Sequence, residues 1–301
     1  MGRRLVLAAA VAILLAGRAA VAECRKPVAT ITPLASAGER LLVPVTLDGA
    51  PTVFELDTGA DLSLISEALA TRLGLRRAVA PRPLLAGADG HPLSAYAMAD
   101  SLLLGGLSRG PMRFVLVPHW QVVDARATGM LGGDLVDELD LDLDLAQPAV
   151  TLYPAESCPG GRPPWPGRSA ALEVTDGHAI VTVTLDGHRL QALIDTGASH
   201  SSLSLTLAAR LFGLRPGGAG MAAGSGTITT DGGRLATWRH RFAALGLAGI
   251  SLPSPTVDLI ERADNPHLAS DHDMVLGLAE LRRLHLYLAY RQRRLFVAVA
   301  P

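Results

Sequence analysis

The chain has 301 residues, and its 27 lysine and arginine residues balance 28 aspartate and glutamate residues, for a formal net charge of −1. This balance excludes an overall electric field that would attract nucleic acid or an anionic membrane. Apolar residues make up 49% and aromatic residues 4%, beside 31 glycines and 20 prolines. Such a composition is typical of many short strands joined by tight turns, so we expect an all-β fold, long enough for two separate cores.

Residues 1–22 have the pattern of a secretory signal peptide. Arg3 and Arg4 precede an apolar stretch over residues 5–16, and a small-x-small cleavage site ends at Ala22. The mature chain would begin near Glu23, in the periplasm or secreted, and the arginine pair leaves a twin-arginine export signal open. An uncleaved anchor helix is the alternative, but the apolar stretch is shorter than the ~20 residues of a membrane span. No other segment of the sequence is expected to cross a bilayer, so we expect no stable membrane insertion after cleavage.

Cys24 and Cys158 are the two cysteines of the chain. In an oxidising compartment an even pair is more often bridged than free, so we predict a disulfide, with two unrelated thiols as the alternative. The bridge would tie the mature N-terminus to a Pro/Gly-rich linker over residues 156–168. Two cysteines so far apart do not make a metal site, and we expect no metal ion and no cofactor.

The linker separates two halves that repeat one another. Residues 43–73 match residues 181–211 at a constant offset of 138, with 16 identities in 31 ungapped positions. An agreement of this extent indicates an internal duplication. We therefore predict two homologous lobes, over residues 28–155 and 169–301.

Each half is expected to begin with a β-hairpin and to continue with a short helix. Asp-Gly dipeptides at residues 48–49 and 186–187 lie between apolar and β-branched runs, which predicts primed hairpin turns. Ser66 and Ser204 are predicted to be the N-caps of the helices. The two helices are predicted to end at Gly74 and Gly213. Later strands are predicted over residues 112–118 and 293–300.

The second strand of each hairpin leads into the same turn, Asp-Thr-Gly-Ala, at residues 57–60 and 195–198. In both halves an apolar residue followed by Leu-Gly comes later, at residues 130–132 and 275–277, ahead of a predicted short helix. This combination, present twice in register, resembles the retropepsin-like aspartic proteases over nearly all of the mature chain. The resemblance implies two retropepsin-like β-barrel lobes in a bilobal, pepsin-like arrangement. Because both lobes would pair within one chain, we expect a monomer.

The resemblance also implies a catalytic pair, Asp57 and Asp195, one from each lobe. Two carboxyl groups in contact cannot both ionise, so one would act as an acid towards the peptide carbonyl and the other would activate a water. The implied function is an aspartic endopeptidase that acts on a peptide or protein substrate. The residues implied to support the pair are Thr58, Gly59, Thr196 and Gly197.

A non-catalytic peptide-binding protein that retains the fold is the alternative function. Two features favour the enzyme: both Asp-Thr-Gly turns are retained, and burying a pair of acids costs free energy that a binding protein has no chemical reason to spend. A serine nucleophile is improbable, because Ser199 and Ser201 lack a partnered base in the sequence.

Glycine-rich stretches over residues 85–95 and 220–236 occupy the place where the family carries flaps that close over a peptide. Plain mobile loops are the alternative interpretation. The candidate substrate-binding residues of the two stretches are Gly87, Asp89, Gly90, Gly224 and Gly226.

Residues 137–147 alternate aspartate with leucine. The strict alternation puts Asp140, Asp142 and Asp144 on one face of a strand, which favours a solvated strand edge over a calcium-binding loop. After the two Leu-Gly motifs the halves differ, with Gly133-Asp134 against Leu278-Ala279. This difference leaves the contacts at the interface of the lobes open at this point.

Overall fold

The structure is a computed structural model. It describes residues 24–35, 40–86, 92–120, 124–158, 162–224, 226–228, 234–260 and 272–300. The predicted signal peptide therefore lies outside the described residues. Among the helices that are described, none is long and apolar enough to cross a membrane.

The first half of the chain forms a nine-stranded sheet. In spatial order its strands are β10 (Leu107–Arg109), β9 (Leu102–Leu104), β2 (Leu42–Leu47), β3 (Ala50–Leu56), β12 (Gly129–Leu131), β4 (Leu64–Ser66), β11 (Met112–Val117), β8 (Ala95–Ala99) and β5 (Arg76–Val79). The hairpin between β2 and β3 turns at Asp48 and Gly49, which both have positive φ, 47° and 80°. Positive φ at both central residues is what a primed turn requires, and the prediction there is confirmed.

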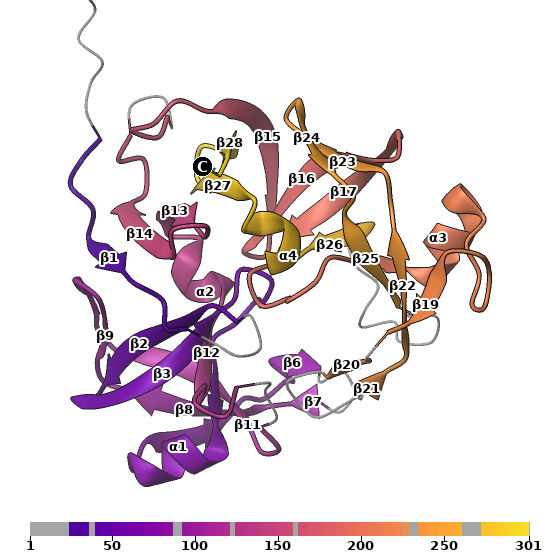
Figure 1. Ribbon diagram of the computed structural model, residues 1–301. Coiled ribbons are helices and arrows are strands. Elements are labelled where there is room, and N and C mark those ends of the chain that lie inside the picture. Colours follow the sequence, from indigo (N-terminus) through magenta and orange to yellow (C-terminus); the bar gives the residue numbers. More distant parts are fainter. Residues whose placement is uncertain are drawn as a thin grey trace, which may run out of the picture.

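The second half repeats this order strand for strand. Figure 1 shows the two halves as two lobes, indigo to magenta and pink to yellow. The equivalent strands are β24 (Ile250–Pro253), β23 (Ala244–Leu247), β16 (His178–Leu185), β17 (His188–Ile194), β26 (Met274–Leu276), β18 (Ser202–Ser204), β25 (Thr256–Ile260), β22 (Thr237–Arg241) and β19 (Met221–Ala223). Asp186 and Gly187 turn the β16–β17 hairpin with φ of 44° and 85°. The duplication in the sequence is thus a duplication of topology.

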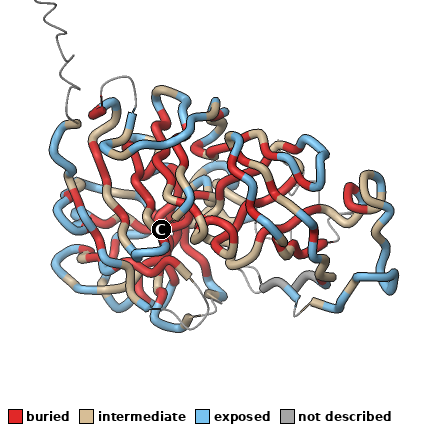
Figure 2. Tube along the Cα trace, turned by 45° about the horizontal axis from the view of Figure 1, so that its top comes forward, coloured by how far each residue is buried: buried red, intermediate tan, exposed pale blue. Residues whose placement is uncertain are grey.

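Six further strands connect the two lobes in one antiparallel row. Their order is β1 (Ala29–Ile31), β14 (Ala149–Pro154), β13 (Leu139–Asp144), β27 (Leu284–Ala289), β28 (Arg294–Val299) and β15 (Arg168–Thr175). At its centre β13 of the first half pairs with β27 of the second half. Buried residues run through both lobes and through the strands between them, and exposed residues gather in the outer turns (Figure 2). All-β and bilobal therefore describe the fold, as predicted.

Four short helices are present in the described residues: α1 (Glu67–Arg72), α2 (Gly133–Val136), α3 (Leu205–Phe212) and α4 (Leu278–Leu281). The hydroxyls of Ser66 and Ser204 accept hydrogen bonds from the amides of Leu69 and Leu207, so both predicted N-caps are confirmed. Gly213 ends α3 with φ of 68°, and α2 and α4 directly follow the two Leu-Gly motifs.

A two-stranded hairpin lies in each of the predicted flap stretches. The pairs are β6 (Leu85–Ala86) with β7 (Pro92–Leu93), and β20 (Thr227–Ile228) with β21 (Arg234–Leu235), and Figure 1 draws both on the same side of the molecule. Gly87, Asp89 and Gly90 lie outside the described residues. The amides of Gly224 and Gly226 donate to the backbone carbonyl and the hydroxyl of Thr237, at 2.9 and 3.1 Å, which holds them to β22.

The predicted solvated edge at residues 140–144 is wrong. β13 has a paired strand on each side, and Asp140 and Asp142 are buried; Asp144 alone is partly exposed. The β27 side chains supply the polar partners, because the hydroxyl of Tyr287 donates to Asp140 Oδ2 at 3.1 Å and His285 Nε2 lies 2.6 Å from Asp142 Oδ1. Strand alternation was predicted correctly, but the face that carries the aspartates is covered by protein.

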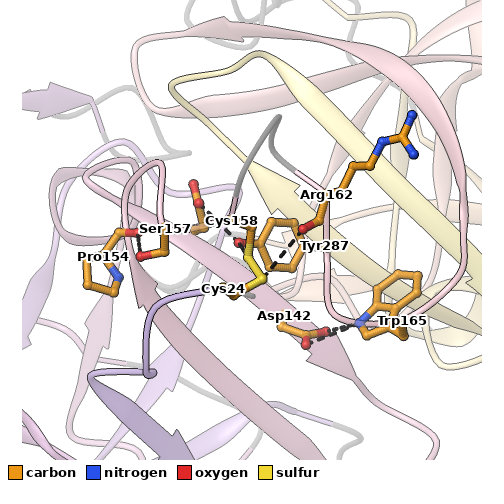
Figure 3. Close-up of a disulfide and its surroundings, with 9 residues drawn as sticks. Cys24, Asp142, Pro154, Ser157, Cys158, Arg162, Trp165 and Tyr287 are labelled. Atoms are coloured by element: carbon orange, nitrogen blue, oxygen red, sulfur yellow. Dashed lines mark hydrogen bonds between the residues drawn. A yellow bond between two sulfur atoms is a disulfide. The ribbon is translucent and has the colours of Figure 1, made fainter. Parts of the chain in front are cut away.

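The predicted disulfide joins Cys24 to Cys158, and Figure 3 shows it beside this polar group. The hydroxyl of Tyr287 lies 3.0 Å from Cys158 Sγ, and the indole of Trp165 donates to the carboxylate of Asp142 at 3.2 Å. The bridge fixes the segment that leads into β1, which pairs with β14 at the outer side of the six connecting strands.

Candidate active site

The two Asp-Thr-Gly turns meet where the lobes face each other. Each turn follows the inner strand of its hairpin, and the amides of Asp57 and Asp195 donate to the carbonyls of Leu131 and Leu276 at 2.9 and 3.1 Å. These leucines belong to the two Leu-Gly motifs, and both are fully buried in the core. The motif that follows each turn in the sequence thus holds the backbone at its aspartate.

Thr58 and Thr196 cross-link the two turns underneath the aspartates. The amide of each threonine donates to the hydroxyl of the other at 3.1 Å. In addition the hydroxyl of Thr58 donates to the carbonyl of Ile194 at 2.7 Å, and that of Thr196 donates to the carbonyl of Leu56 at 2.6 Å. Both threonines are fully buried, so these four hydrogen bonds fix the relative position of the lobes at one point.

Gly59 and Gly197 let the carboxyl groups approach the opposite turn. A Cβ on Gly59 would collide with the carboxyl of Asp195, and a Cβ on Gly197 would collide with the carboxyl of Asp57. The amides of these glycines donate to Oδ1 of the aspartate in their own turn, at 2.8 Å in both lobes. The structure therefore brings the six predicted residues of the two turns together in one place.

The carboxyl of Asp57 is buried, and its environment favours the protonated form. Burial raises the pKa of Asp57 well above its usual range, the charges of Asp195 and Glu55 raise it further, and the hydrogen bond from the Gly59 amide lowers it. A hydrogen bond between the Asp57 and Asp195 side chains also raises this pKa. The raised pKa of Asp57 is what a buried carboxyl group with a second carboxyl group beside it is expected to show.

The segments behind the turns are held by a serine and an acid in each lobe. The hydroxyl of Ser63 donates to Asp134 Oδ1 at 2.6 Å and accepts from the amide of Gly132 at 3.1 Å. In the second lobe the hydroxyl of Ser201 donates to Glu280 and accepts from the amide of Gly277 at 3.0 Å. These contacts lie within each lobe, and the acid comes from a different position after the Leu-Gly motif in the two lobes.

Two polar contacts near the pair cross from one lobe to the other. His178 Nε2 lies 2.7 Å from Asp61 Oδ1, and Arg40 Nη1 donates to the backbone carbonyl of Gly197. Arg40 also donates to Glu55 Oε1 at 3.0 Å. At the offset of 138, Arg40 corresponds to His178, so the repeat places a nitrogen-bearing side chain that contacts the other lobe at the same point of both lobes.

Sequence reasoning missed Arg40 and Glu55. A signal was present, because the repeat aligns Glu55 with Leu193 in a strand that is otherwise apolar before the turn. A charged residue at a position that is apolar in the other copy indicates either exposure or a special local role. Only the structure shows that Glu55 is buried.

Comparison with protein families agrees with this geometry. The family model described as "Aspartyl protease" matches residues 43–135 and again residues 181–279, once in each lobe. The two matches together span more than half of the chain, which therefore belongs to the aspartyl protease family, of the retropepsin-like kind. Comparison with curated proteins gives no match.

Proposed function

We propose that the protein is an aspartic endopeptidase whose catalytic pair is Asp57 and Asp195. Its family supports a peptidase acting on peptide substrates. The assignment of Asp57 and Asp195 as the catalytic pair is supported by the reciprocal hydrogen bonds between Thr58 and Thr196. These bonds hold the two Asp-Thr-Gly turns together, so that each lobe supplies one carboxyl group to the same junction. Because each lobe supplies one acid, a single chain contains the whole pair, and we propose that the monomer is the active form.

The chemistry follows from two acids that share one proton. The carboxylate accepts a proton from a water held between the pair, and the water oxygen forms a bond to the scissile carbonyl carbon. The protonated acid gives its proton to the carbonyl oxygen, so a neutral gem-diol results. Its collapse breaks the C–N bond as the protonated carboxyl gives its proton to the leaving amine nitrogen. The other carboxylate takes a proton from a hydroxyl of the gem-diol, so the pair again holds one proton.

The hairpins β6–β7 and β20–β21 are proposed to bind the substrate backbone, together with the glycines predicted in these stretches. Extended peptides gain affinity from backbone hydrogen bonds to strand-like segments. Cys24–Cys158 is a bond of the type that persists in oxidising compartments, which supports export of the protein to the periplasm or beyond. We propose cleavage of the signal peptide after Ala22, and lobes bounded at residues 28–155 and 169–301.

The test is substitution of each aspartate in the mature protein. Asp57→Asn and Asp195→Asn should each lower the rate of hydrolysis of a diverse peptide library by more than about 1,000-fold, and the double variant should be no worse, because the two residues act as a unit. Asparagine keeps the shape of aspartate but cannot exchange the proton. A statine-type transition-state mimic should inhibit the parent protein.

Two outcomes would contradict the proposal. Substantial activity in both single variants would mean that the two turns do not form one site. A parent protein that binds peptides but hydrolyses none of the library between pH 3 and pH 8 would instead support the peptide-binding alternative. Circular dichroism of the variants serves as the control for folding.

A further inference from the structure

Glu55 lies on the face of β3 that carries the catalytic aspartate. Successive side chains of a strand point to opposite faces, and Phe54 and Leu56 are both fully buried in the main core of the molecule. Glu55 therefore points to the other face, the one that Asp57 shares two residues later. Only 2% of Glu55 is exposed, so a third carboxyl group is buried beside the pair.

Arg40 ties this third carboxyl to the second lobe. Its guanidinium donates through Nη1 both to Glu55 Oε1, at 3.0 Å, and to the carbonyl of Gly197, the glycine of the opposite Asp-Thr-Gly turn. The side chain of Arg40 is 17% exposed. One short chain of contacts thus leads from Glu55 through Arg40 to the turn that carries Asp195.

Glu55 shares its surroundings with several other charged groups. Burial raises the pKa of Glu55 to about 7; the charge and hydrogen bond of Arg40 lower it, and the charges of Asp195 and Asp124 raise it. Asp124 is itself paired with Arg126, Nη2 to Oδ2 at 2.6 Å. Glu55 in turn contributes to the raised pKa of Asp57, so the protonation of Glu55 is linked to that of Asp57.

The second lobe does without such a group. Leu193 is the repeat equivalent of Glu55, and it is buried with 4% exposed. A buried ion pair is often no more stabilising than apolar residues of similar size, so stability alone does not account for Arg40 and Glu55 in one lobe only. We therefore consider the effect of Arg40 and Glu55 on the neighbouring Asp57 and Asp195.

We propose that Glu55, held by Arg40, is a positioning residue for the proton of the Asp57–Asp195 pair and extends hydrolysis towards neutral pH. Once ionised, Glu55 places a negative charge next to the pair, which opposes loss of the last shared proton. The protonated acid that the reaction needs then survives to higher pH. Below about pH 6 Glu55 is mostly neutral and has little effect. This inference rests on the proposed function.

The first experiment compares pH profiles of kcat/KM for the parent protein and Glu55→Gln. Glutamine imitates the neutral acid, so the rate at pH 5 should stay within about twofold of the parent. The alkaline limb should move down by about one pH unit, which lowers the rate near pH 7.5 about tenfold. Glu67→Gln is the matched control, because Glu67 is a half-exposed acid of the same lobe paired with Arg77, and its loss should leave the profile unchanged.

An equal loss of rate at every pH would assign Glu55 a structural role and overturn the proposal, as would an unchanged alkaline limb. A second measurement does not depend on activity: carboxyl-carbon NMR titration of Asp57 and Asp195. Their highest apparent pKa should fall by about one unit in Glu55→Gln, and in the parent their signals should follow the titration of Glu55. Independence of the three titrations in the parent would refute the coupling even if the variant does not fold. Failure of the proposed function would be recognised separately, because the parent protein itself would then hydrolyse no peptide.

Discussion

Thr58 and Thr196 determine how closely the two aspartates are held. Each threonine uses its hydroxyl as donor to a backbone carbonyl and as acceptor from the amide of the other threonine. All of these groups are buried, so removing a hydroxyl would leave two backbone groups without partners. This is costly because a buried, unpaired amide or carbonyl loses its hydration and gains nothing in return.

We therefore expect Thr58→Val to lower the free energy of unfolding by about 2–4 kcal/mol, since valine keeps the volume but offers no hydrogen bond. Urea unfolding of the purified protein measures the loss. Thr58→Ser is the control; it retains the hydroxyl and should stay within about 1.5 kcal/mol of the parent. Equal stability of the valine and serine variants would show that the cross-link contributes nothing.

Among the elements, β13 is a strand as predicted, but its Asp140 and Asp142 side chains are buried where solvent exposure was predicted. Its aspartates face β27 and the disulfide, and burial raises the pKa of Asp140 to about 6, although the hydrogen bond from Tyr287 lowers it. The folded state therefore holds a proton on Asp140 at pH values where the unfolded chain, with a pKa near 3.8, has lost it. Such a group contributes stability that is fully present below about pH 4 and is lost as the pH rises through about 6.

Asp140→Asn should reduce this pH dependence. We expect the loss of unfolding free energy between pH 4.5 and pH 7.5 to shrink by about 1–3 kcal/mol, because asparagine still accepts from Tyr287 but carries no charge to bury. Thermal or urea unfolding across pH measures the effect. Asp144→Asn, on the same face of β13 and partly exposed, is the control and should change the slope little. Parallel pH curves for the parent and Asp140→Asn would contradict the assignment.

For the whole molecule, the strands between the lobes join the two halves, and the disulfide closes the first half on itself. Cys24 and Cys158 are separated by 134 residues, so the bridge closes a loop that contains most of the first lobe. In the chain-entropy account a loop of this length gives a stabilisation of about 4–5 kcal/mol. We expect the exported protein to begin near Glu23 with the bridge intact, and Cys24→Ser with Cys158→Ser to lower the free energy of unfolding by about 2–5 kcal/mol.

Mass mapping of the exported protein without reductant tests the first expectation, and urea unfolding of the double variant tests the second. The proposed catalytic pair lies where the two Asp-Thr-Gly turns meet, and neither cysteine takes part in those contacts, so peptide hydrolysis at 20 °C should remain in the double variant. An exported chain that still carries residues 1–22 would contradict the signal peptide, and two free thiols would contradict the bridge in the exported form.

The sequence by itself determined the duplicated all-β fold, the primed hairpin turns and the helix caps. These features depend on short-range rules: turn residues need positive φ, caps bond to amides three residues away, and strand side chains alternate. The repeat then doubled each signal. The meeting of the two turns, with Asp57 beside Asp195, was predicted only through the resemblance to the retropepsin-like aspartic proteases.

Only the tertiary structure decided which charged residues are buried and with which partners. Asp140 and Asp142 are on the predicted strand, but their exposure depends on β27, which comes from the far end of the chain. Arg40 reaches Glu55 across 15 residues and Gly197 across 157, and no local pattern fixes either contact. Burial and charge pairing are set by segments distant in sequence, and they turn an acid that looks exposed into one whose pKa bears on stability or on the catalytic pair.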